Sequence, residues 1–249
     1  MDPGLLRKLI AEALGTFALV FFGVGSAVFG ISVTGPWGVA LTFGFVMVAL
    51  VYAFGPISGC HLNPAITVGA LLARRIDPLD AAWYAGAQVG GGIIGAMMIK
   101  VVVAWGNARD QTGVLGANDY GTHVNAGGAF LIEVLLTFLL VFVVLMVTGH
   151  AATPGLAGFT IGLALSAVYL VSLPLDGGGA NPARSIGPAL WAAHAPLAHL
   201  WLFIIAPLLG GSIAAAAAEL LGYDTHQPTL TGEDEHLFYR DTARHRYRD

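Results

Sequence analysis

Long apolar runs separated by short polar stretches dominate the pattern of residues along the chain. Six of these runs are each long enough to cross a bilayer core, because about 20 apolar residues span ~30 Å as a helix. We place them at Leu9–Val33, Trp37–Phe54, Ala81–Trp105, Ala126–Val147, Gly155–Leu175 and His199–Leu221. The pattern therefore predicts an all-α membrane protein with six transmembrane helices.

Two further apolar segments are too short to span, and each opens with the tripeptide Asn-Pro-Ala. The first begins with Asn63, Pro64 and Ala65, and the second with Asn181, Pro182 and Ala183. Asn is a favoured N-cap residue, and Pro suits the first helical position, where its missing N–H costs nothing. A helix of ten residues rises only ~15 Å, about half of the bilayer core. We expect two re-entrant half-helices that meet tip to tip near the midplane.

The two halves of the chain resemble each other. The ten residues from Glu12 match the ten from Glu133 at seven positions. Each half contains three spans and one half-span, and an odd number of spans forces the copies into opposite orientations. This is the pattern of an inverted repeat, which places its functional site between the halves. We expect one domain over residues 1–222, with repeats at about 5–106 and 126–222, and a polar cytoplasmic tail at 223–249.

Composition supports the lipid bilayer as the chain's environment. Of 249 residues, 56% are hydrophobic and 10% are charged, and the mean hydropathy is +0.75. A soluble domain carries far more charge. The formal net charge is −4 and no basic cluster occurs, so we expect no nucleic-acid partner.

Basic residues indicate how the chain is oriented. Eight of them fall on one side of the six-span arrangement: Arg7, Lys8, Arg74, Arg75, Arg240, Arg244, Arg246 and Arg248. Cytoplasmic loops carry an excess of Lys and Arg. We therefore expect a multi-pass protein of the cell membrane with both termini in the cytoplasm.

The sequence offers little for catalysis. Ser58 and His61 are too close together to form a nucleophile and its base, and no carboxylate is spaced to complete a triad. No His, Cys and carboxylate residues have metal-ligand spacing, and Cys60 is the single cysteine. We expect no enzyme activity, no metal and no cofactor.

Several polar residues fall at membrane depth, where charge is expensive and non-helical backbone must be covered by protein or line a water-filled cavity. Glu12 and Glu133 could form a proton relay, or they could accept hydrogen bonds from the backbone of the two loops. Their equivalent places in the two halves favour the second role. We assign His61 to the same support of the loop. Arg184 follows Asn181 on the same short helix, where it either ties down the preceding Gly-rich loop, lines a pore, or does both.

The motif residues resemble a known family. Ser58-Gly-Cys-His-Leu-Asn-Pro-Ala65 and Asn181-Pro-Ala-Arg-Ser-Ile-Gly-Pro188 are similar to the two signature loops of aquaporins and glycerol facilitators, and the start Ala11–Phe17 is similar too. The resemblance covers about Leu9–Gly222. It implies an aquaporin-like fold with one pore per subunit, and a homotetramer.

The resemblance also implies which residues form the selectivity filter. Phe43 fits the aromatic position of the second helix, and Arg184 fits the arginine after the second Asn-Pro-Ala. Tyr169 stands where water channels usually carry His and glycerol facilitators Gly. Gly178 stands where water channels often carry Thr or Cys and glycerol facilitators an aromatic residue. This set departs from both patterns, whereas Ser185 resembles the water-channel branch.

These observations predict a passive channel for water that excludes protons and ions. The alternative within the fold is a facilitator of glycerol or another small neutral solute, such as ammonia or hydrogen peroxide. A secondary transporter also uses inverted repeats and broken helices. It needs an ion or proton site, however, and we expect Asp176, the carboxylate nearest the Asn-Pro-Ala loops, to face the outer mouth.

Overall fold

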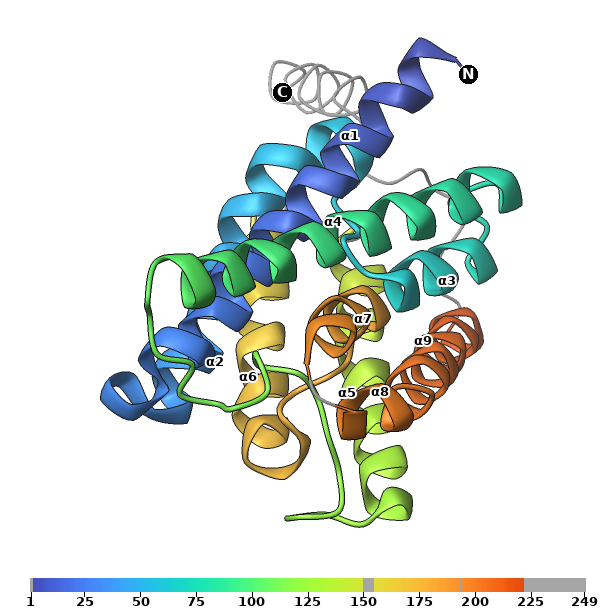
Figure 1. Ribbon diagram of the computed structural model, residues 1–249. Coiled ribbons are helices and arrows are strands. Elements are labelled where there is room, and N and C mark those ends of the chain that lie inside the picture. The colour runs from blue at the N-terminus through green and yellow to red at the C-terminus, as the bar shows by residue number, and fades with distance from the viewer. Residues whose placement is uncertain (1, 150–154, 193, 222–249) are drawn as a thin grey trace, which may run out of the picture.

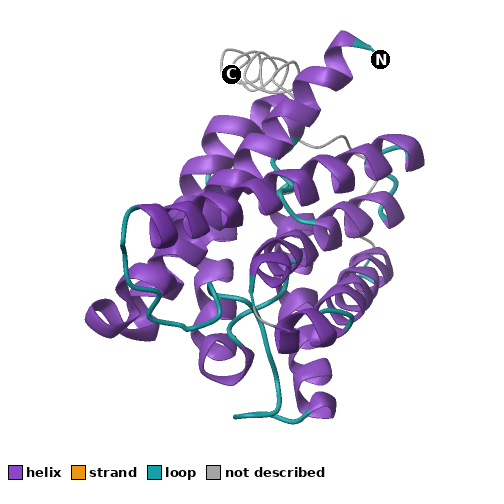
Figure 2. Cartoon of the chain, viewed as in Figure 1, coloured by secondary structure: helices purple, strands orange, loops and turns teal. Residues whose placement is uncertain are grey.

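The structure is a computed structural model that describes residues 2–149, 155–192 and 194–221. These residues form helices and loops, with no strand among them (Figure 2). The elements are α1 (Pro3–Ala18), the π-helix η1 (Leu19–Val24), α2 (Gly25–Ser58), α3 (Pro64–Leu72), α4 (Pro78–Trp105), α5 (Ala126–Val147), α6 (Ala157–Asp176), α7 (Pro182–Trp191), α8 (His194–His199) and α9 (Leu202–Leu220). The expected tail at 223–249 lies outside the described residues.

The first two predicted spans form one helical stretch with a sharp break. Among the described residues, five helical stretches are long and apolar enough to cross a membrane, and the first of them, Pro3–Ser58, has 56 residues. A straight helix of that length would extend ~84 Å, well beyond one bilayer. Gly35 interrupts it with φ 64° and ψ 179°, and Pro36 follows. Because Pro disfavours helical backbone before it and Gly tolerates positive φ, this pair divides the stretch into two spans.

Two half-helices occupy the middle of the molecule. Asn63 and Asn181 cap α3 and α7 with extended backbone, and their side-chain oxygens accept from the N–H groups of Ala65 and Ala183, at 2.8 and 2.9 Å. Figure 1 shows α3 and α7 between α4 and α9, and the two half-helices meet at their starts. The predicted half-helices are confirmed. The loop before the first is shorter than expected, because α2 continues through Pro56 to Ser58.

Each half-helix packs closely against the other half of the chain. A methyl group added at Gly92 of α4 would overlap the backbone carbonyl of Ala183, and one at Gly211 of α9 would lie 2.6 Å from the carbonyl oxygen of Ala65. The two contacts are equivalent in the two repeats. The alanine of each Asn-Pro-Ala motif therefore needs a glycine on the last span of the opposite repeat.

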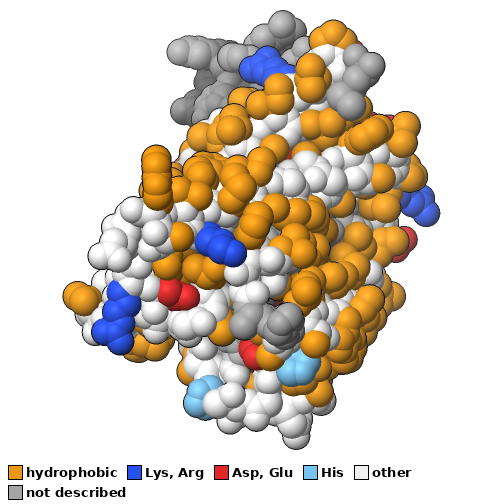
Figure 3. Space-filling model, viewed as in Figure 1, with side chains coloured by type: hydrophobic (Ala, Val, Ile, Leu, Met, Phe, Trp, Pro, Cys, Tyr) orange, Lys and Arg blue, Asp and Glu red, His pale blue; other side chains and the backbone are white. Residues whose placement is uncertain are grey.

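The outer surface is largely apolar. Figure 3 shows hydrophobic side chains over most of the visible face, with few charged groups among them. Large apolar side chains such as Phe45, Leu131, Phe159 and Ile205 are more than half exposed. A soluble protein rarely exposes so much continuous apolar surface, whereas the hydrocarbon core of a bilayer solvates such a surface. The fold is that of an all-helical membrane protein.

Candidate functional site

The two capping asparagines also bind the opposite loop. Asn63 Nδ2 donates to the carbonyl of Ala180 at 2.8 Å, and Asn181 Nδ2 donates to the carbonyl of Leu62 at 2.9 Å. Both side chains are at most 5% exposed. An amide NH2 group has two N–H donors. Among the described residues each amide makes one such bond, so its second N–H is available to a molecule between the two half-helices.

Glu12 holds the first loop from behind. Its Oε1 accepts from the Ser58 hydroxyl at 2.7 Å and from His61 N at 3.0 Å, and its Oε2 accepts from Leu62 N and from Gln88 Nε2, both at 2.7 Å. In a trans peptide the N–H points opposite to the preceding C=O. The carbonyls of Cys60 and His61 therefore point away from Glu12, and both residues line an internal cavity on that side.

Glu133 does the same for the second loop. Its carboxylate accepts from Gly179 N at 3.0 Å and from Ala180 N at 2.6 Å. A methyl group at Gly179 would overlap this carboxylate, so glycine is needed for the close approach. By the same peptide geometry, the carbonyls of Gly178 and Gly179 point away from Glu133. Both loops thus present rows of acceptors that are fixed by a buried carboxylate on the far side.

His61 is fixed within the first loop. Its Nδ1 lies 3.1 Å from the hydroxyl of Thr67, and its ring lies edge-on to Tyr84, with 5.3 Å between centroids. Tyr84 in turn donates its hydroxyl to the carbonyl of Ser58 at 2.9 Å. The side chain of His61 is 3% exposed. These contacts make it part of the packing behind the loop.

Arg184 is bound by carbonyls that surround the start of α7. Its Nη1 donates to the carbonyl of Gly116 at 2.9 Å and to Asn118 Oδ1 at 2.8 Å, and its Nη2 donates to the carbonyl of Gly177 at 3.0 Å. The residue is 1% exposed, and its Nε has no partner among the described residues. A buried N–H without a partner is costly, so Nε is a donor for a passing polar molecule.

Phe43 and Tyr169 lie next to this arginine and pack face to face. Their ring centroids are 3.7 Å apart with 12° between the planes, and Arg184 Cζ is 5.8 Å from the centroid of Phe43. Rings at that separation leave no space between them for water. Any passage at this level therefore runs beside the aromatic pair and not between its members.

Gly178 touches Tyr169 directly. A methyl group at Gly178 would lie 2.6 Å from Tyr169 Cδ1 and 2.7 Å from Cε1. The backbone φ of Gly178 is +76°, which favours glycine. Tyr169 and Gly178 therefore lie on the same side of the passage. The large ring fills the volume that the missing side chain leaves, because the two residues share one wall.

A narrow pocket adjoins the first loop. Apolar side chains of α2, α3, α5 and α6 line most of it, together with the loop residues Gly59, Cys60 and His61. Arg75 lines its far end and is anchored by donating to Thr148 Oγ1 and to the carbonyl of Leu145, both at 2.8 Å. An apolar wall facing a row of carbonyls suits small molecules that need acceptors and few other contacts.

Comparison with known proteins decides the family. A family model described as "Major intrinsic protein" matches residues 2–217. The chain belongs to the major intrinsic protein family.

Curated relatives of this major intrinsic protein carry two kinds of name. "Glycerol uptake facilitator protein-like 6" of Lactiplantibacillus plantarum is 42% identical over 219 residues, which cover 87% of this chain and 99% of the relative. "Aquaporin Z" of Bradyrhizobium diazoefficiens is 40% identical over 216 residues, which cover 84% and 90%. The solved aquaglyceroporin of Plasmodium falciparum superposes with a TM-score of 0.75 at 21% identity, covering 86% of this chain and 96% of that one. The fold is therefore aquaporin-like, and the family identifies the chain as a membrane channel protein.

Asp176 is the buried carboxylate of this major intrinsic protein whose position differs from the expectation. Asp176 does not face an open mouth, because it is 3% exposed and its Oδ1 accepts from Gly178 N at 3.1 Å. Glu12 and Glu133, by contrast, lie directly behind the two loops and accept from the loop backbone, as their symmetry favoured. These positions depend on how distant helices pack, which distance along the chain does not reveal.

Two polar residues beside the loops were not singled out from the sequence. Gln88 of α4 donates to Glu12 and, at 2.9 Å, to the hydroxyl of Thr67. Asn118 accepts from Arg184 and, at 2.8 Å, from the hydroxyl of Ser185. A polar residue within an apolar span could have revealed Gln88. Asn118 lies in a polar loop, and nothing in the sequence links it to Arg184.

Proposed function

We propose that this major intrinsic protein is a passive water channel that excludes protons and ions. The observation that carries the proposal is the face-to-face packing of Tyr169 on Phe43 beside Arg184. It places a bulky residue where the resemblance gives glycerol facilitators a glycine. The narrow passage that remains admits water more readily than a three-carbon polyol, because pore width and lining donors set selectivity in such channels.

The route for water follows from the donors and acceptors of the described residues. Free N–H groups of Asn63 and Asn181 meet the file of molecules at the centre, and Arg184 Nε meets it at the constriction. The carbonyls of Cys60 and His61 on one side, and of Gly178 and Gly179 on the other, accept from it. Each water molecule in the single file can then replace the hydrogen bonds it made in bulk water with hydrogen bonds to the residues that line the passage.

Exclusion of protons follows from the two helix ends. The N-termini of α3 and α7 each bring roughly +0.5 charge to the centre. One unit of positive charge at ~4 Å repels a proton by ~4 kcal/mol with an effective dielectric of ~20. Both Asn side chains donate there, so a water molecule between them accepts and cannot pass a proton along the file.

Glycerol transport is the second candidate, because a relative 42% identical to the chain is named as a glycerol uptake facilitator. Ammonia and hydrogen peroxide are other small solutes that such a passage could admit. Coupled secondary transport is less well supported. Each oxygen of Glu12 and of Glu133 already accepts from an N–H or O–H donor of the protein, so both carboxylates serve the loops.

Stopped-flow light scattering of proteoliposomes tests the proposal. We expect fast shrinkage in sucrose and slow re-swelling in glycerol for the unmodified protein. Tyr169→Gly should raise glycerol flux by at least tenfold and water flux by much less, because it removes the ring beside the passage. Phe45→Ala, which changes an exposed aromatic residue on the lipid-facing surface, is the control. Glycerol flux as high as water flux in the unmodified channel would refute the choice of water.

We also propose the assembly and orientation that the resemblance and the basic residues imply. The chain would form a homotetramer in the plasma membrane, with both termini in the cytoplasm. Light scattering of the detergent-solubilised protein measures the mass of the assembly. Labelling of single cysteines placed at Asp2 and at Gly121, in a Cys60→Ser background, reports which side each residue faces.

A further inference from the structure

The loop before the second Asn-Pro-Ala motif carries a carboxyl group where the first loop carries a hydroxyl. Asp176 and Ser58 each lie five positions before the asparagine of their motif. Ser58 Oγ accepts from Cys60 N at 3.1 Å, and Asp176 Oδ1 accepts from Gly178 N at the same distance. Each side chain thus binds the N–H group two residues further on. The two side chains are equivalent in the inverted repeat.

The next N–H group of each loop binds the buried glutamate. His61 N donates to Glu12 Oε1 and Gly179 N donates to Glu133 Oε1, both at 3.0 Å. In the first loop the serine hydroxyl also donates to Glu12 Oε1, at 2.7 Å. Because the backbone bonds have matching lengths in the two loops, the aspartate has its carboxyl beside Glu133 where the serine has its hydroxyl beside Glu12.

An ionised aspartate cannot take over the role of the serine. A hydroxyl both accepts and donates, whereas a carboxylate has no donor and only a protonated carboxyl has one. Glu133 and Asp176 are 0% and 3% exposed and interact electrostatically. Arg184 is the one cation among the described residues that acts on both carboxyls. With both carboxyls ionised, one buried negative charge would have no counter-charge, which is costly.

Glu133 also has fewer donors than its counterpart. Glu12 accepts from two backbone N–H groups, a serine hydroxyl and a glutamine amide. Glu133 accepts from two backbone N–H groups and, within the part of the chain that the structure describes, from no side chain. Asp176 Oδ2 is buried and has no partner within the same residues. One proton between the two carboxyls supplies the missing donor.

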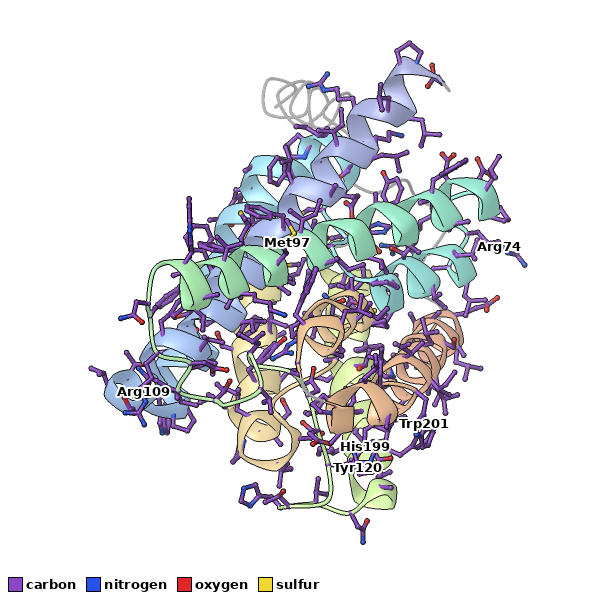
Figure 4. The ribbon with its side chains drawn as sticks, viewed as in Figure 1. Arg74, Met97, Arg109, Tyr120, His199 and Trp201 are labelled. Carbon is purple, nitrogen blue, oxygen red and sulfur yellow. The ribbon has the colours of Figure 1, made fainter. Side chains whose placement is uncertain are left out.

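The loop between α4 and α5 covers this site. Its Asn118 Nδ2 and Asp119 N donate to the backbone carbonyl of Asp176 at 3.3 and 3.1 Å. Next along the loop, Tyr120 stacks on His199 with 3.9 Å between ring centroids, and Figure 4 shows the two side chains lying together. The loop is anchored at both points and keeps water from the aspartate. A carboxyl without water around it has little to stabilise a negative charge.

We propose that Asp176 holds a proton and donates it in a hydrogen bond to Glu133, and that it is a positioning residue for the selectivity filter. The neutral acid does in the second loop what the serine does in the first, because it accepts from Gly178 N and donates to the glutamate. Gly178 is thereby fixed against Tyr169. The inference rests on the proposed water-channel function, because a second ionised carboxylate near Arg184 would attract cations toward the constriction.

Infrared spectroscopy of proteoliposomes at neutral pH tests for the proton directly. A protonated carboxyl has a C=O stretching band that a carboxylate lacks, and an ordinary aspartate is ionised at neutral pH. We expect the unmodified protein to show such a band, which shifts when the aspartates are labelled with a heavy carbon isotope. The band should be absent in Asp176→Ser. Asp77→Asn, which changes an exposed aspartate, is the control and should retain it.

Substitutions at Asp176 test the positioning role. Asp176→Ser supplies the hydroxyl that the first loop uses, and Asp176→Asn has the shape of the neutral acid with an N–H donor in place of the O–H. Both keep the two hydrogen bonds, so water flux and the midpoint of thermal unfolding should stay close to those of the unmodified protein. Asp176→Ala leaves Gly178 N and Glu133 without a partner, and should lower the midpoint by about 2–12 °C and reduce the flux.

The outcomes separate this inference from the proposed function. A spectrum without a band that depends on Asp176 would show that the aspartate is ionised, and a band that labelled aspartate does not shift would place the proton on Glu133. Either result overturns the inference. A loss of stability in Asp176→Ser as large as in Asp176→Ala would overturn the positioning role. Water flux no faster than that of empty liposomes, with the band present, would refute the proposed function alone.

Discussion

The contact between Gly178 and Tyr169 makes a sharp prediction about both stability and transport. Gly178→Ala adds a methyl group 2.6 Å from Tyr169 Cδ1, on a backbone with φ +76°. The left-handed backbone costs an L-residue about 1–2 kcal/mol. Overpacking against the ring costs about 1–3 kcal/mol more. We expect the variant to lose about 2–5 kcal/mol in the free energy of unfolding.

A second glycine separates these two costs. Gly113 has φ +74° and open space within 4 Å of the added methyl group. Gly113→Ala therefore pays only for the backbone, about 1–2 kcal/mol. The difference between the two variants, about 1–3 kcal/mol, measures the collision with Tyr169 together with a closer approach, at 3.2 Å, to Ser172 Oγ.

A double-mutant cycle then identifies the partner. In a Tyr169→Gly background the ring is gone, so Gly178→Ala should cost no more than Gly113→Ala does. Reversible unfolding in mixed micelles measures the free energies. Stopped-flow measurement should also show reduced water flux for Gly178→Ala alone, because the ring is pushed toward the passage. Equal costs for Gly178→Ala and Gly113→Ala in the unmodified background would show that Tyr169 and Gly178 do not share one wall.

The remaining predictions test the centre and the packing of the repeats. Asn181→Asp puts a carboxylate between the two positive helix ends, so we expect a leak of protons or cations, which a pH-sensitive dye in proteoliposomes measures. A folded variant that remains impermeable to protons and cations would contradict the electrostatic account of exclusion. Glu12→Gln replaces an acceptor of two backbone N–H groups with a partial donor, and we expect a loss of about 3 kcal/mol or more in unfolding free energy, against little change for Asp77→Asn, whose exposed side chain makes no capping bond. Gly92→Ala forces a methyl group onto the Ala183 carbonyl and should destabilise the folded protein by about 1–3 kcal/mol. Gly90→Ala has open space around the added methyl group and should stabilise the protein by up to ~1 kcal/mol. Equal effects of the two substitutions on the free energy of unfolding would refute the role of close packing.

Local chemistry let the sequence predict the spans and the half-helices. The Gly35-Pro36 break and the Asn-Pro starts of α3 and α7 depend on the backbone preferences of a few adjacent residues, and apolar length alone specifies a span. The matching segments that begin at Glu12 and Glu133 indicated the inverted repeat for the same reason. These features need no knowledge of which helices touch.

Tertiary structure decided the contacts between segments that are far apart in the chain. The bonds of Asn63 to the Ala180 carbonyl and of Asn181 to the Leu62 carbonyl exist only because the two repeats interlock. Tyr169 and Gly178 share one wall because a loop with positive φ folds back onto α6, and Asn118 binds Arg184 because a loop between the repeats crosses the start of α7. Such contacts depend on distances of a few ångströms between packed elements, and the pattern of apolar and polar residues along one segment carries no record of them.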